Sequence, residues 1–495
     1  MKKASILFLG LVLSVLTFAS GNNRFNEVFG PLFHPAPNVP PLVGPRHGLE
    51  SLHRWNVIAI NATGLDHTPV APGENRVFGE QIGPGRSSRA MAIVHIAMFD
   101  ALDAVVGGFT SYAGTHAGPG SISVDAAISQ AARDTLAAMF PSQTPTFNAY
   151  LAQDLAAVRN GQQRANGIDL GQRTAAAILA MRLNDGSQIP EPRVGVDYFP
   201  SDQPGHWRQD PISLIPLALG AHWGQCIPFV VTSTSQFRAP PPPAMTSSAY
   251  TAAYNEVKNL GGAEITTQRT EEQTFIGIFW AYDGTPSLCA PPRLYNQITV
   301  QIADQRRLSA IQFARLLALV NVAMADAGMT IWESKYYYDF WRPVLGIRES
   351  DPGTGPTGLG DGNPDTVGDA NFSPLGAPAS NLTGPNFTPP FPAYPSGHAG
   401  FGGALFQVMR RFYATDNIAF TFVSDEFNGQ TRDNIGNIRP FRPRSFSNLS
   451  QAEEENGQSR IYLGIHWSFD KTEGIAQGHR VGDYVFDHAF RPTHP

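Results

Sequence analysis

Three short stretches hold an unusual set of cationic and imidazole side chains. They read K-x6-R-P, P-S-G-H and S-R-x5-H-x3-D, in that order along the chain. The residues concerned are Lys335, Arg342, Pro343, Ser396, Gly397, His398, Arg460, His466 and Asp470. Arg presents a planar fork of N–H donors, Lys a point charge, and glycine lets backbone N–H groups come close to a ligand. This set predicts a site for a tetrahedral oxyanion such as phosphate or vanadate.

The two histidines give such a site chemistry beyond binding. One imidazole can bond covalently to the central atom of the oxyanion. The other can donate or accept a proton near neutral pH. His398 and His466 are the candidates for these two roles.

Spacing gives partial information on how these side chains are positioned. Lys335 and Arg342 are seven residues apart, so on one helix they would share a face, roughly 10 Å apart, and Pro343 would end that helix. Arg460 and His466 are six apart, which does not place them on one helical face. His466 and Asp470 are four apart, so we expect the carboxylate to orient the imidazole.

The three stretches and their flanks resemble the superfamily of vanadium-dependent haloperoxidases and type 2 phosphatidic acid phosphatases. The segments F-P-A-Y-P-S-G-H-A-G-F-G-G-A (391–404) and A-M-A-D-A-G (323–328) are similar to the chloroperoxidase branch. The similarity extends over about residues 275–490. Gaps of 51 residues between Pro343 and Pro395, and of 60 between His398 and Ser459, are long for compact membrane phosphatases and favour a haloperoxidase.

The resemblance implies a role for each residue of the set. Vanadate would be the cofactor, bound covalently through His466, with hydrogen peroxide and halide as substrates and hypohalous acid as product. His398 would be the acid–base group. Lys335, Arg342 and Arg460 would compensate the negative charge of the vanadate oxygens, and Ser396 and Gly397 would donate further hydrogen bonds. Trp332 and Phe391 would line the halide side. Asp283 and Asp470 would not touch vanadate but would hold Arg460 and His466 respectively.

Two other functions use the same residues. In a soluble acid phosphatase, His466 would attack phosphorus to form a phosphohistidine, and His398 would protonate the leaving alcohol. In a secreted helical binding protein, the site would have lost its activity. The residues in direct contact with the oxyanion do not distinguish a haloperoxidase from a phosphatase. The long loops and the flanking segments favour the haloperoxidase.

The N-terminus is typical of a secretory signal peptide over residues 1–20. Met1-Lys2-Lys3 precedes an apolar run at 6–18 and small residues at 19–21. A membrane anchor is the alternative, although the apolar run is short for a span. We therefore expect a secreted or periplasmic protein with no membrane span in the mature chain.

Composition excludes one class of partner. The net charge is −6, and removing Lys2 and Lys3 leaves 33 basic and 41 acidic residues, a net charge of −8. This balance gives no support to nucleic-acid binding. Cys226 and Cys289 could form a disulfide in an exported protein, and the sequence does not decide whether they do. The sequence predicts no oligomeric state.

Apolar spacing predicts an all-α fold of two helical bundles with long irregular loops. An irregular arm (22–85) and a first bundle make up residues 21–245, and a second bundle with the oxyanion site makes up 246–495. A proline-rich stretch at 239–244 separates them. The helices are expected at 89–106, 124–140, 146–158, 168–183, 248–259, 271–282, 294–303, 307–334, 403–413, 448–464 and 472–486.

Two other polar groups have weaker interpretations. His95 and Asp100, inside a predicted helix, are interpreted as polar anchors of the bundle rather than a second site. The loop 351–390 contains an Asp/Asn series faintly like a calcium loop, but its twelfth position is Phe372 instead of Glu. We expect this loop to shape the entrance to the site.

Overall fold

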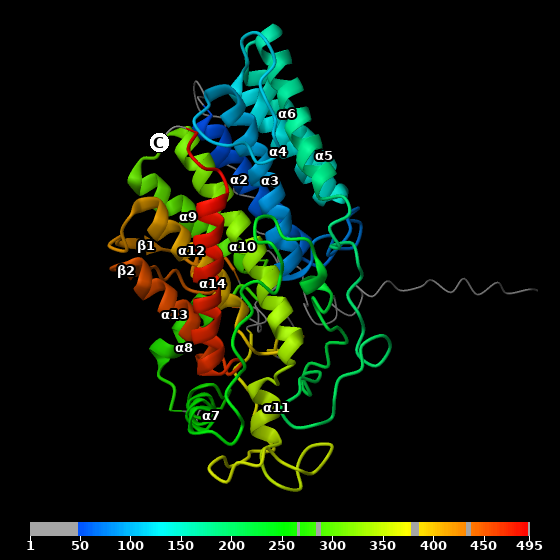
Figure 1. Cartoon of the computed structure of the whole chain (residues 1–495), viewed down its shortest axis with the longest axis vertical. Helices are drawn as coiled ribbons and strands as arrows, with labels where there is room; N and C mark the ends of the chain where they lie inside the picture. Colours follow the sequence, from blue (N-terminus) through cyan, green and yellow to red (C-terminus); the bar gives the residue numbers. More distant parts are fainter. Residues whose placement is uncertain (1–47, 265–267, 284–288, 378–385, 432–436, 494–495) are drawn as a thin grey trace, which may run out of the picture.

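Helices are the main regular structure of the protein, and long irregular segments join them (Figure 1). The computed structural model describes residues 48–264, 268–283, 289–377, 386–431 and 437–493, so the predicted signal peptide lies outside it. The first-half helices are α2 (Leu49–Asp66), α3 (Gly83–Val106), α4 (Val124–Met139), α5 (Thr144–Ala157) and α6 (Gln162–Met181). The second-half helices are α7 (Ser248–Leu260), α8 (Glu271–Phe279), α9 (Pro291–Arg306), α10 (Ala310–Tyr338), α11 (Pro343–Arg348), α12 (Gly397–Tyr413), α13 (Leu449–Tyr462) and α14 (Ser468–His488).

Within the described residues, strand pairing is confined to one small hairpin-like sheet and isolated bridges. Strands β1 (Phe420–Phe422) and β2 (Arg444–Phe446) pair antiparallel. Residues 186–245 form a long irregular segment that contains a single turn of 3-10 helix, Trp223–Gln225. The all-α fold class with long irregular loops is therefore confirmed.

Helix α10 is the central element of the fold. It packs against α3 from the first half of the chain and against α12 and α14 from the second (Figure 1). By length and composition it is the one described helix that could cross a bilayer, yet 83% of its most apolar window is buried inside the protein. One apolar core is continuous from α2 through α10 to α14. Residues of α10 thus hold a position at the middle of the molecule.

Close contact between α12 and α14 depends on glycine. A Cβ atom on Gly478 would lie 2.2 Å from the carbonyl oxygen of Gly400, and one on Gly474 would lie 2.7 Å from that of Ser396. Both distances are shorter than Cβ contacts allow, so only glycine permits this approach. The two helices therefore begin side by side, which brings the P-S-G-H stretch next to the first turn of α14.

Two predictions about local structure are wrong. The segment 22–85 was expected to be irregular, but its described part contains α2, whose residues Leu52, Trp55 and Ala59 are fully buried. Helix α10 ends at Tyr338, where Asp339 adopts a left-handed conformation (φ 50°), and Pro343 begins α11 instead of ending α10. Lys335 and Arg342 therefore do not share a helix.

The remaining polar groups have structural partners. His95 contacts the carbonyl of Met91 and the side chain of Asn56, and Asp100 accepts backbone N–H bonds from residues 112 and 113, in agreement with their interpretation as anchors. Asp361 accepts bonds from within its own loop. Cys226 and Cys289 are both buried free thiols.

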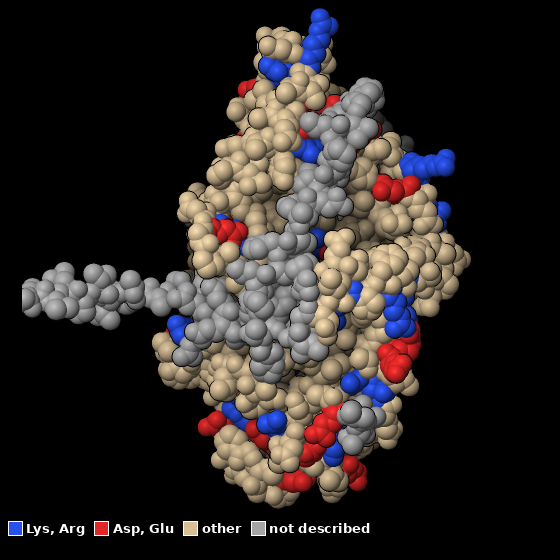
Figure 2. Space-filling model, turned by 180° about the vertical axis from the view of Figure 1, so that it is seen from behind, with Lys and Arg blue, Asp and Glu red and all other residues tan. Residues whose placement is uncertain are grey.

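Charged side chains on the face shown in Figure 2 occur as small groups of mixed sign. Among the described residues many charged side chains are paired, for example Arg444 with Glu272 and Glu455. The described residues on the face shown in Figure 2 form no extended basic surface of the kind that binds nucleic acid.

Candidate active site

The structure brings the three sequence stretches together at one buried place. Lys335 lies in the last turn of α10 and Arg342 caps the N-terminus of α11. Ser396 caps α12, Arg460 lies in the last turn of α13, and His466 lies in the connection to α14. All five residues are buried, with at most 3% of their surface exposed. Ends of four helices therefore converge on one point.

Gly464 explains how Arg460 and His466 reach the same site. It has φ +73°, and a Cβ atom there would lie 2.3 Å from the carbonyl oxygen of Gly261. Glycine at this position allows the chain to turn sharply after α13. The turn places Arg460, on the helix, and His466, beyond it, on the same side of the site.

The imidazole of His466 is held in one tautomer. Its Nδ1 lies 2.8 Å from Oδ2 of Asp470, which also accepts the backbone N–H of Trp467 at 3.0 Å. Its Nε2 accepts a hydrogen bond from Nη1 of Arg342 at 3.0 Å. Burial and the nearby Arg342 and Lys335 hold the pKa of His466 well below its usual value. The neutral ring therefore directs the lone pair of Nε2 into the site.

Carbonyl oxygens, not carboxylates, hold two of the three cations. Lys335 Nζ donates to the carbonyls of Pro392 and Ala393, both at 2.8 Å. Arg342 donates from Nε to Phe391 O at 2.9 Å and from Nη1 to the carbonyl of residue 465 at 2.8 Å. Burial lowers the pKa of Lys335 well below its usual value and that of Arg342 to about 9. Both groups are desolvated cations that an anion would stabilise.

Arg460 is held by Asp283, the one carboxylate among the described residues that pairs directly with Lys335, Arg342 or Arg460. Its Nη2 lies 2.7 Å from each oxygen of Asp283, and the two side chains are 1% and 6% exposed. Three buried guanidinium nitrogens have no hydrogen-bond partner: Nε and Nη1 of Arg460, and Nη2 of Arg342. Buried donors without partners are rare in proteins and indicate a missing acceptor.

The N-terminus of α12 adds further donors. Ser396 caps this helix by accepting from the N–H of Ala399 at 3.4 Å. The first N–H groups of a helix have no acceptor within the helix and carry partial positive charge. Those of Gly397 and His398 lie in this first turn, at the type of position where anions bind.

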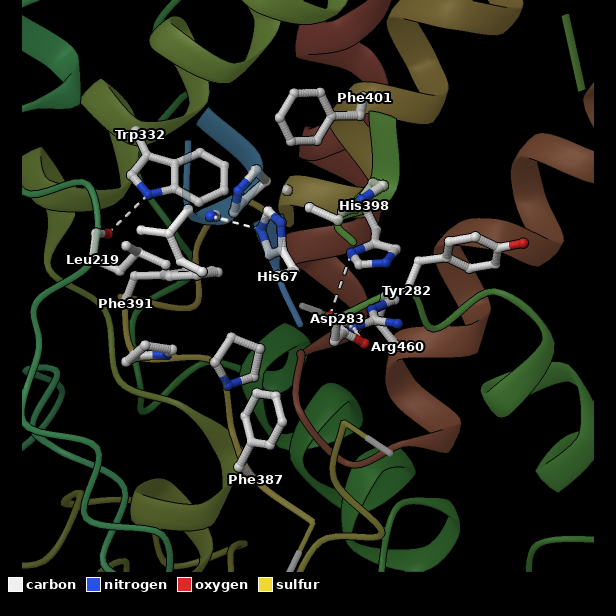
Figure 3. Close-up of a pocket in the computed structure, with 18 of the residues that line it drawn as sticks. His67, Leu219, Tyr282, Asp283, Trp332, Phe387, Phe391, His398, Phe401 and Arg460 are labelled. Atoms are coloured by element: carbon white, nitrogen blue, oxygen red, sulfur yellow. Dashed lines mark hydrogen bonds and ion pairs between the residues drawn. The ribbon is translucent and has the colours of Figure 1, made fainter. Parts of the chain in front are cut away.

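His398 is neutral and tightly held. Its Nε2 donates to the carbonyl of Ala281 at 2.5 Å, and its Nδ1 lies 3.9 Å from Asp283 Oδ1 (Figure 3). Its own carbonyl accepts bonds from Tyr295 Oη at 2.9 Å and from Asn456 Nδ2 at 3.0 Å. Burial, followed by the charge of Arg460, lowers the pKa of His398 to about 3. The free lone pair on Nδ1 makes it a proton acceptor.

A pocket partly open to solvent leads to this site. Trp332, Phe391 and Leu219 lie on one side of it, and His398, Asp283 and Arg460 on the other (Figure 3). The rings of Trp332 and Phe391 pack with centroids 4.8 Å apart. The lining also includes Phe387, Pro389 and Pro390, which confirms that the loop 351–390 helps to form the entrance.

Several residues at the site were not found from the sequence. His67 and Leu219 line the pocket, and Ala281, Tyr295 and Asn456 hold His398. Asn456 precedes Arg460 by four residues, so their shared helical face was available as a signal. The other four lie far from the three stretches and belong to no motif.

Comparison with known proteins assigns the chain to a family. Residues 315–495 match the VCPO second helical-bundle domain. The vanadium chloroperoxidase of Curvularia inaequalis is 32% identical over 502 residues, which cover 84% of this chain and 78% of that protein.

Two solved structures share the fold. A bacterial vanadium-dependent iodoperoxidase superposes with a TM-score of 0.70 at 22% identity, covering 91% of this chain and 100% of that one. An apo-type bacterial vanadium-dependent chloroperoxidase gives 0.61 at 16% identity, covering 82% and 94%. Because the Curvularia inaequalis enzyme is 32% identical over most of both chains, the chain belongs to the vanadium haloperoxidase family.

Proposed function

We propose that this protein is a vanadium-dependent haloperoxidase that uses hydrogen peroxide to oxidise halide to hypohalous acid. Vanadate would be held by His466 Nε2 and by Lys335, Arg342 and Arg460. The observation that carries this proposal is the group of three unpaired buried guanidinium nitrogens on Arg342 and Arg460, beside a histidine whose Nε2 accepts a hydrogen bond from Nη1 of the same Arg342.

The donor set fits an oxyanion. Lys335 and Arg342 bond to carbonyl groups, which leaves their charges without a directly paired carboxylate. Asp283 is engaged with Arg460. Among the described residues, no cluster of three or more His, Cys, Asp or Glu side chains is arranged to hold a metal cation. A group that carries negative oxygens around a central atom with room for one imidazole ligand suits this arrangement, and vanadate is such a group.

The protein residues would divide the work as follows. Vanadate, when bound, supplies a Lewis-acidic centre that activates peroxide toward halide. Asp470 keeps the proton of His466 on Nδ1, so that Nε2 stays available as a ligand. Lys335, Arg342 and Arg460 would compensate negative charge on oxygen from buried positions. Their positions fix the orientation of the bound group.

His398 would accept a proton from hydrogen peroxide at Nδ1. Its pKa of about 3 reflects burial and the charge of Arg460. A bound anion offsets that positive charge and raises the pKa toward neutrality, which makes proton acceptance favourable. Asp283, 3.9 Å from Nδ1, would stabilise the resulting imidazolium.

Trp332 and Phe391 would form the halide side of the site. The Lys335 Nζ atom lies 5.6 Å and 5.3 Å from the centroids of their rings, so a halide beside the rings would also lie near a cation. Phe391 favours chloride as a substrate by its resemblance to chloroperoxidases. We also propose export of the enzyme, which rests on the composition of residues 1–20.

A paired assay on protein stripped of metal tests this function. One arm adds orthovanadate, hydrogen peroxide and bromide or chloride, and follows halogenation of a cyclic diketone. The other follows hydrolysis of nitrophenyl phosphate without vanadate. His466→Ala is the control in both arms. We expect vanadate-dependent halogenation that the variant lacks.

Other outcomes are equally informative. Phosphatase activity that vanadate inhibits, with no halogenation at any pH, would replace the haloperoxidase by the phosphatase and leave the site in place. Absence of both activities, together with absence of vanadate binding, would refute the assignment of these residues as an oxyanion site.

A further inference from the structure

Tyr282 lies between two groups that serve the site. On its N-terminal side, the carbonyl of Ala281 accepts the bond from His398 Nε2 at 2.5 Å. On its C-terminal side, the carboxylate of Asp283 accepts from Arg460 Nη2 at 2.7 Å and lies 3.9 Å from His398 Nδ1. Peptide units are planar, so only the φ and ψ angles of residue 282 join these two groups. The backbone conformation of Tyr282 therefore sets how the carbonyl and the carboxylate are placed relative to each other.

The backbone of Tyr282 adopts a conformation that a tyrosine does not favour. Its φ is +43°, in the left-handed region that residues other than glycine seldom occupy. It comes directly after the end of α8, where the N–H of Ala281 still bonds to the carbonyl of Ile278 at 3.1 Å. A conformation of this kind persists only where surrounding contacts hold it. For Tyr282 the side chain supplies such contacts.

The hydroxyl of Tyr282 is held from two sides. The residue is fully buried, and its ring points away from the centre of the pocket (Figure 3). Its Oη donates to Oε1 of Gln297 on α9 at 3.0 Å and accepts the N–H of Asp425 at 2.6 Å. The Asp425 carboxylate in turn accepts from Gln297 Nε2 and Arg293 Nε, both at 2.9 Å. Arg293 also donates to the carbonyl of Ile60 in α2 at 2.7 Å, so the hydroxyl is tied to three separate segments.

We propose that Tyr282 is a positioning residue that keeps the acid–base histidine and the oxyanion-binding arginine in register through its hydroxyl. The hydroxyl holds the left-handed turn. The turn directs the carbonyl of Ala281 toward His398 and the carboxylate of Asp283 toward Arg460. This inference rests on the proposed function for the nature of the reaction, whereas the contacts that carry it belong to the protein alone.

Tyr282→Phe removes the hydroxyl and keeps the ring. With vanadate, peroxide and iodide, we expect kcat for triiodide formation to fall about tenfold, the scale of one hydrogen bond, with KM for iodide unchanged. Burial lowers the pKa of His398, and its contacts with Asp283 and the Ala281 carbonyl oppose that shift. Weaker contacts lower this pKa further, so the acid limb of the pH–rate profile should move to lower pH. A loss of stability alone would reduce the amount of active enzyme without moving the limb.

Vanadate binding gives a readout without turnover. A displaced Asp283 carboxylate leaves Arg460 less well aligned, so the dissociation constant of vanadate in Tyr282→Phe should rise at least about threefold. Ultrafiltration in the absence of peroxide measures it. Tyr413→Phe is the matched control, because the Tyr413 hydroxyl is buried and has no hydrogen-bond partner among the described residues. It lies at the opposite end of α12 from Ser396, and its loss should change neither the kinetics nor vanadate binding.

Gln297→Leu tests whether the hydroxyl acts through its acceptor. This variant keeps the tyrosine but removes the oxygen to which Tyr282 donates. We expect it to lower kcat and to shift the acid limb in the same direction as Tyr282→Phe. The double variant should be no more affected than Gln297→Leu alone, because both changes break the same bond.

The outcomes separate this inference from the proposed function. Wild-type kinetics, pH profile and vanadate affinity in Tyr282→Phe would refute the positioning role and leave the haloperoxidase standing. Losses that multiply in the double variant would mean that Tyr282 and Gln297 act separately, which also refutes it. If the wild-type protein forms no triiodide but hydrolyses nitrophenyl phosphate, the haloperoxidase fails. The same variants are then compared by their rates of hydrolysis, and unchanged rates would overturn the positioning role as well.

Discussion

Replacing Asp283 with Asn should destabilise the protein by leaving Arg460 as a buried charge without its counter-ion. The two side chains are 1% and 6% exposed, and both carboxylate oxygens lie 2.7 Å from Nη2. Breaking a buried pair by removing one partner costs about 3–5 kcal/mol. A chain of 495 residues has an unfolding entropy of roughly 1 kcal/mol/K, so a loss of that size lowers Tm by about 3–5 °C.

Calorimetry of four proteins measures the interaction energy between Asp283 and Arg460 separately from the contacts that each makes with its surroundings. The set is wild type, Asp283→Asn, Arg460→Gln and the double variant, all without oxyanion. The double variant removes both charges, so we expect it to be more stable than the sum of the single changes by at least about 2 kcal/mol. Asp169→Asn is the matched control, because Asp169 pairs with Arg173 at the surface with side chains 66% and 42% exposed, and its loss should be below about 1 kcal/mol.

Two results would refute this reasoning. A Tm for Asp283→Asn within about 1 °C of wild type, which corresponds to roughly 1 kcal/mol, would mean that the carboxylate does not compensate Arg460. Strict additivity in the double variant would mean that the two side chains act independently, in conflict with the 2.7 Å contacts.

Two further substitutions and one binding experiment test other parts of the site. Asp470→Asn removes the carboxylate at His466 Nδ1, and vanadate affinity measured by ultrafiltration should fall about 10–100-fold. Asn456→Ala removes one of two donors to the His398 carbonyl. It should lower kcat for halide oxidation up to about tenfold, since one hydrogen bond is worth about 1 kcal/mol, while vanadate affinity is retained. Burial, followed by the charge of Arg460, lowers the pKa of His398 to about 3, and a bound anion favours its protonated form, so sulfate binding should take up protons at neutral pH and weaken as pH rises. Calorimetry in two buffers of different ionisation enthalpy measures this uptake, and proton release would contradict it.

The residues of the site could be predicted from sequence because they lie in three compact stretches. Two of the expected contacts are present: Asp470 meets His466 at 2.8 Å, and Asp283 meets Arg460 at 2.7 Å. The first follows from spacing along the chain, and the second from the resemblance. The assignment of vanadate, of halide oxidation and of the individual roles stays a prediction until the experiments above are done.

The relation of Lys335 to Arg342 could not be predicted correctly from spacing. A proline shows that a helix does not continue through it, but the helix can end earlier, as α10 does at Tyr338. The left-handed conformation of Asp339 (φ 50°) is what ends it, and such a conformation in a non-glycine residue has no strong sequence signal. Proline is also favoured in the first turn of a helix, which is its position in α11.

The pocket walls were beyond sequence reasoning for a different reason. His67 and Leu219 reach the pocket only through tertiary contacts, with Gly83 and with Trp332 respectively. Neither residue belongs to a motif, and a single histidine or leucine in a loop does not indicate a site. Helix α2 is a separate case, because Leu52, Trp55 and Ala59 follow helical spacing and would have revealed it.

The most direct test of the central claim is an anomalous-scattering map from a crystal of the protein soaked in orthovanadate. We predict one strong vanadium peak at bonding distance from His466 Nε2, with Lys335, Arg342 and Arg460 in contact with its oxygens, and no such peak in His466→Ala. A fully soaked crystal with vanadium at another place, or with none bound, would contradict the assignment of these residues as an oxyanion site.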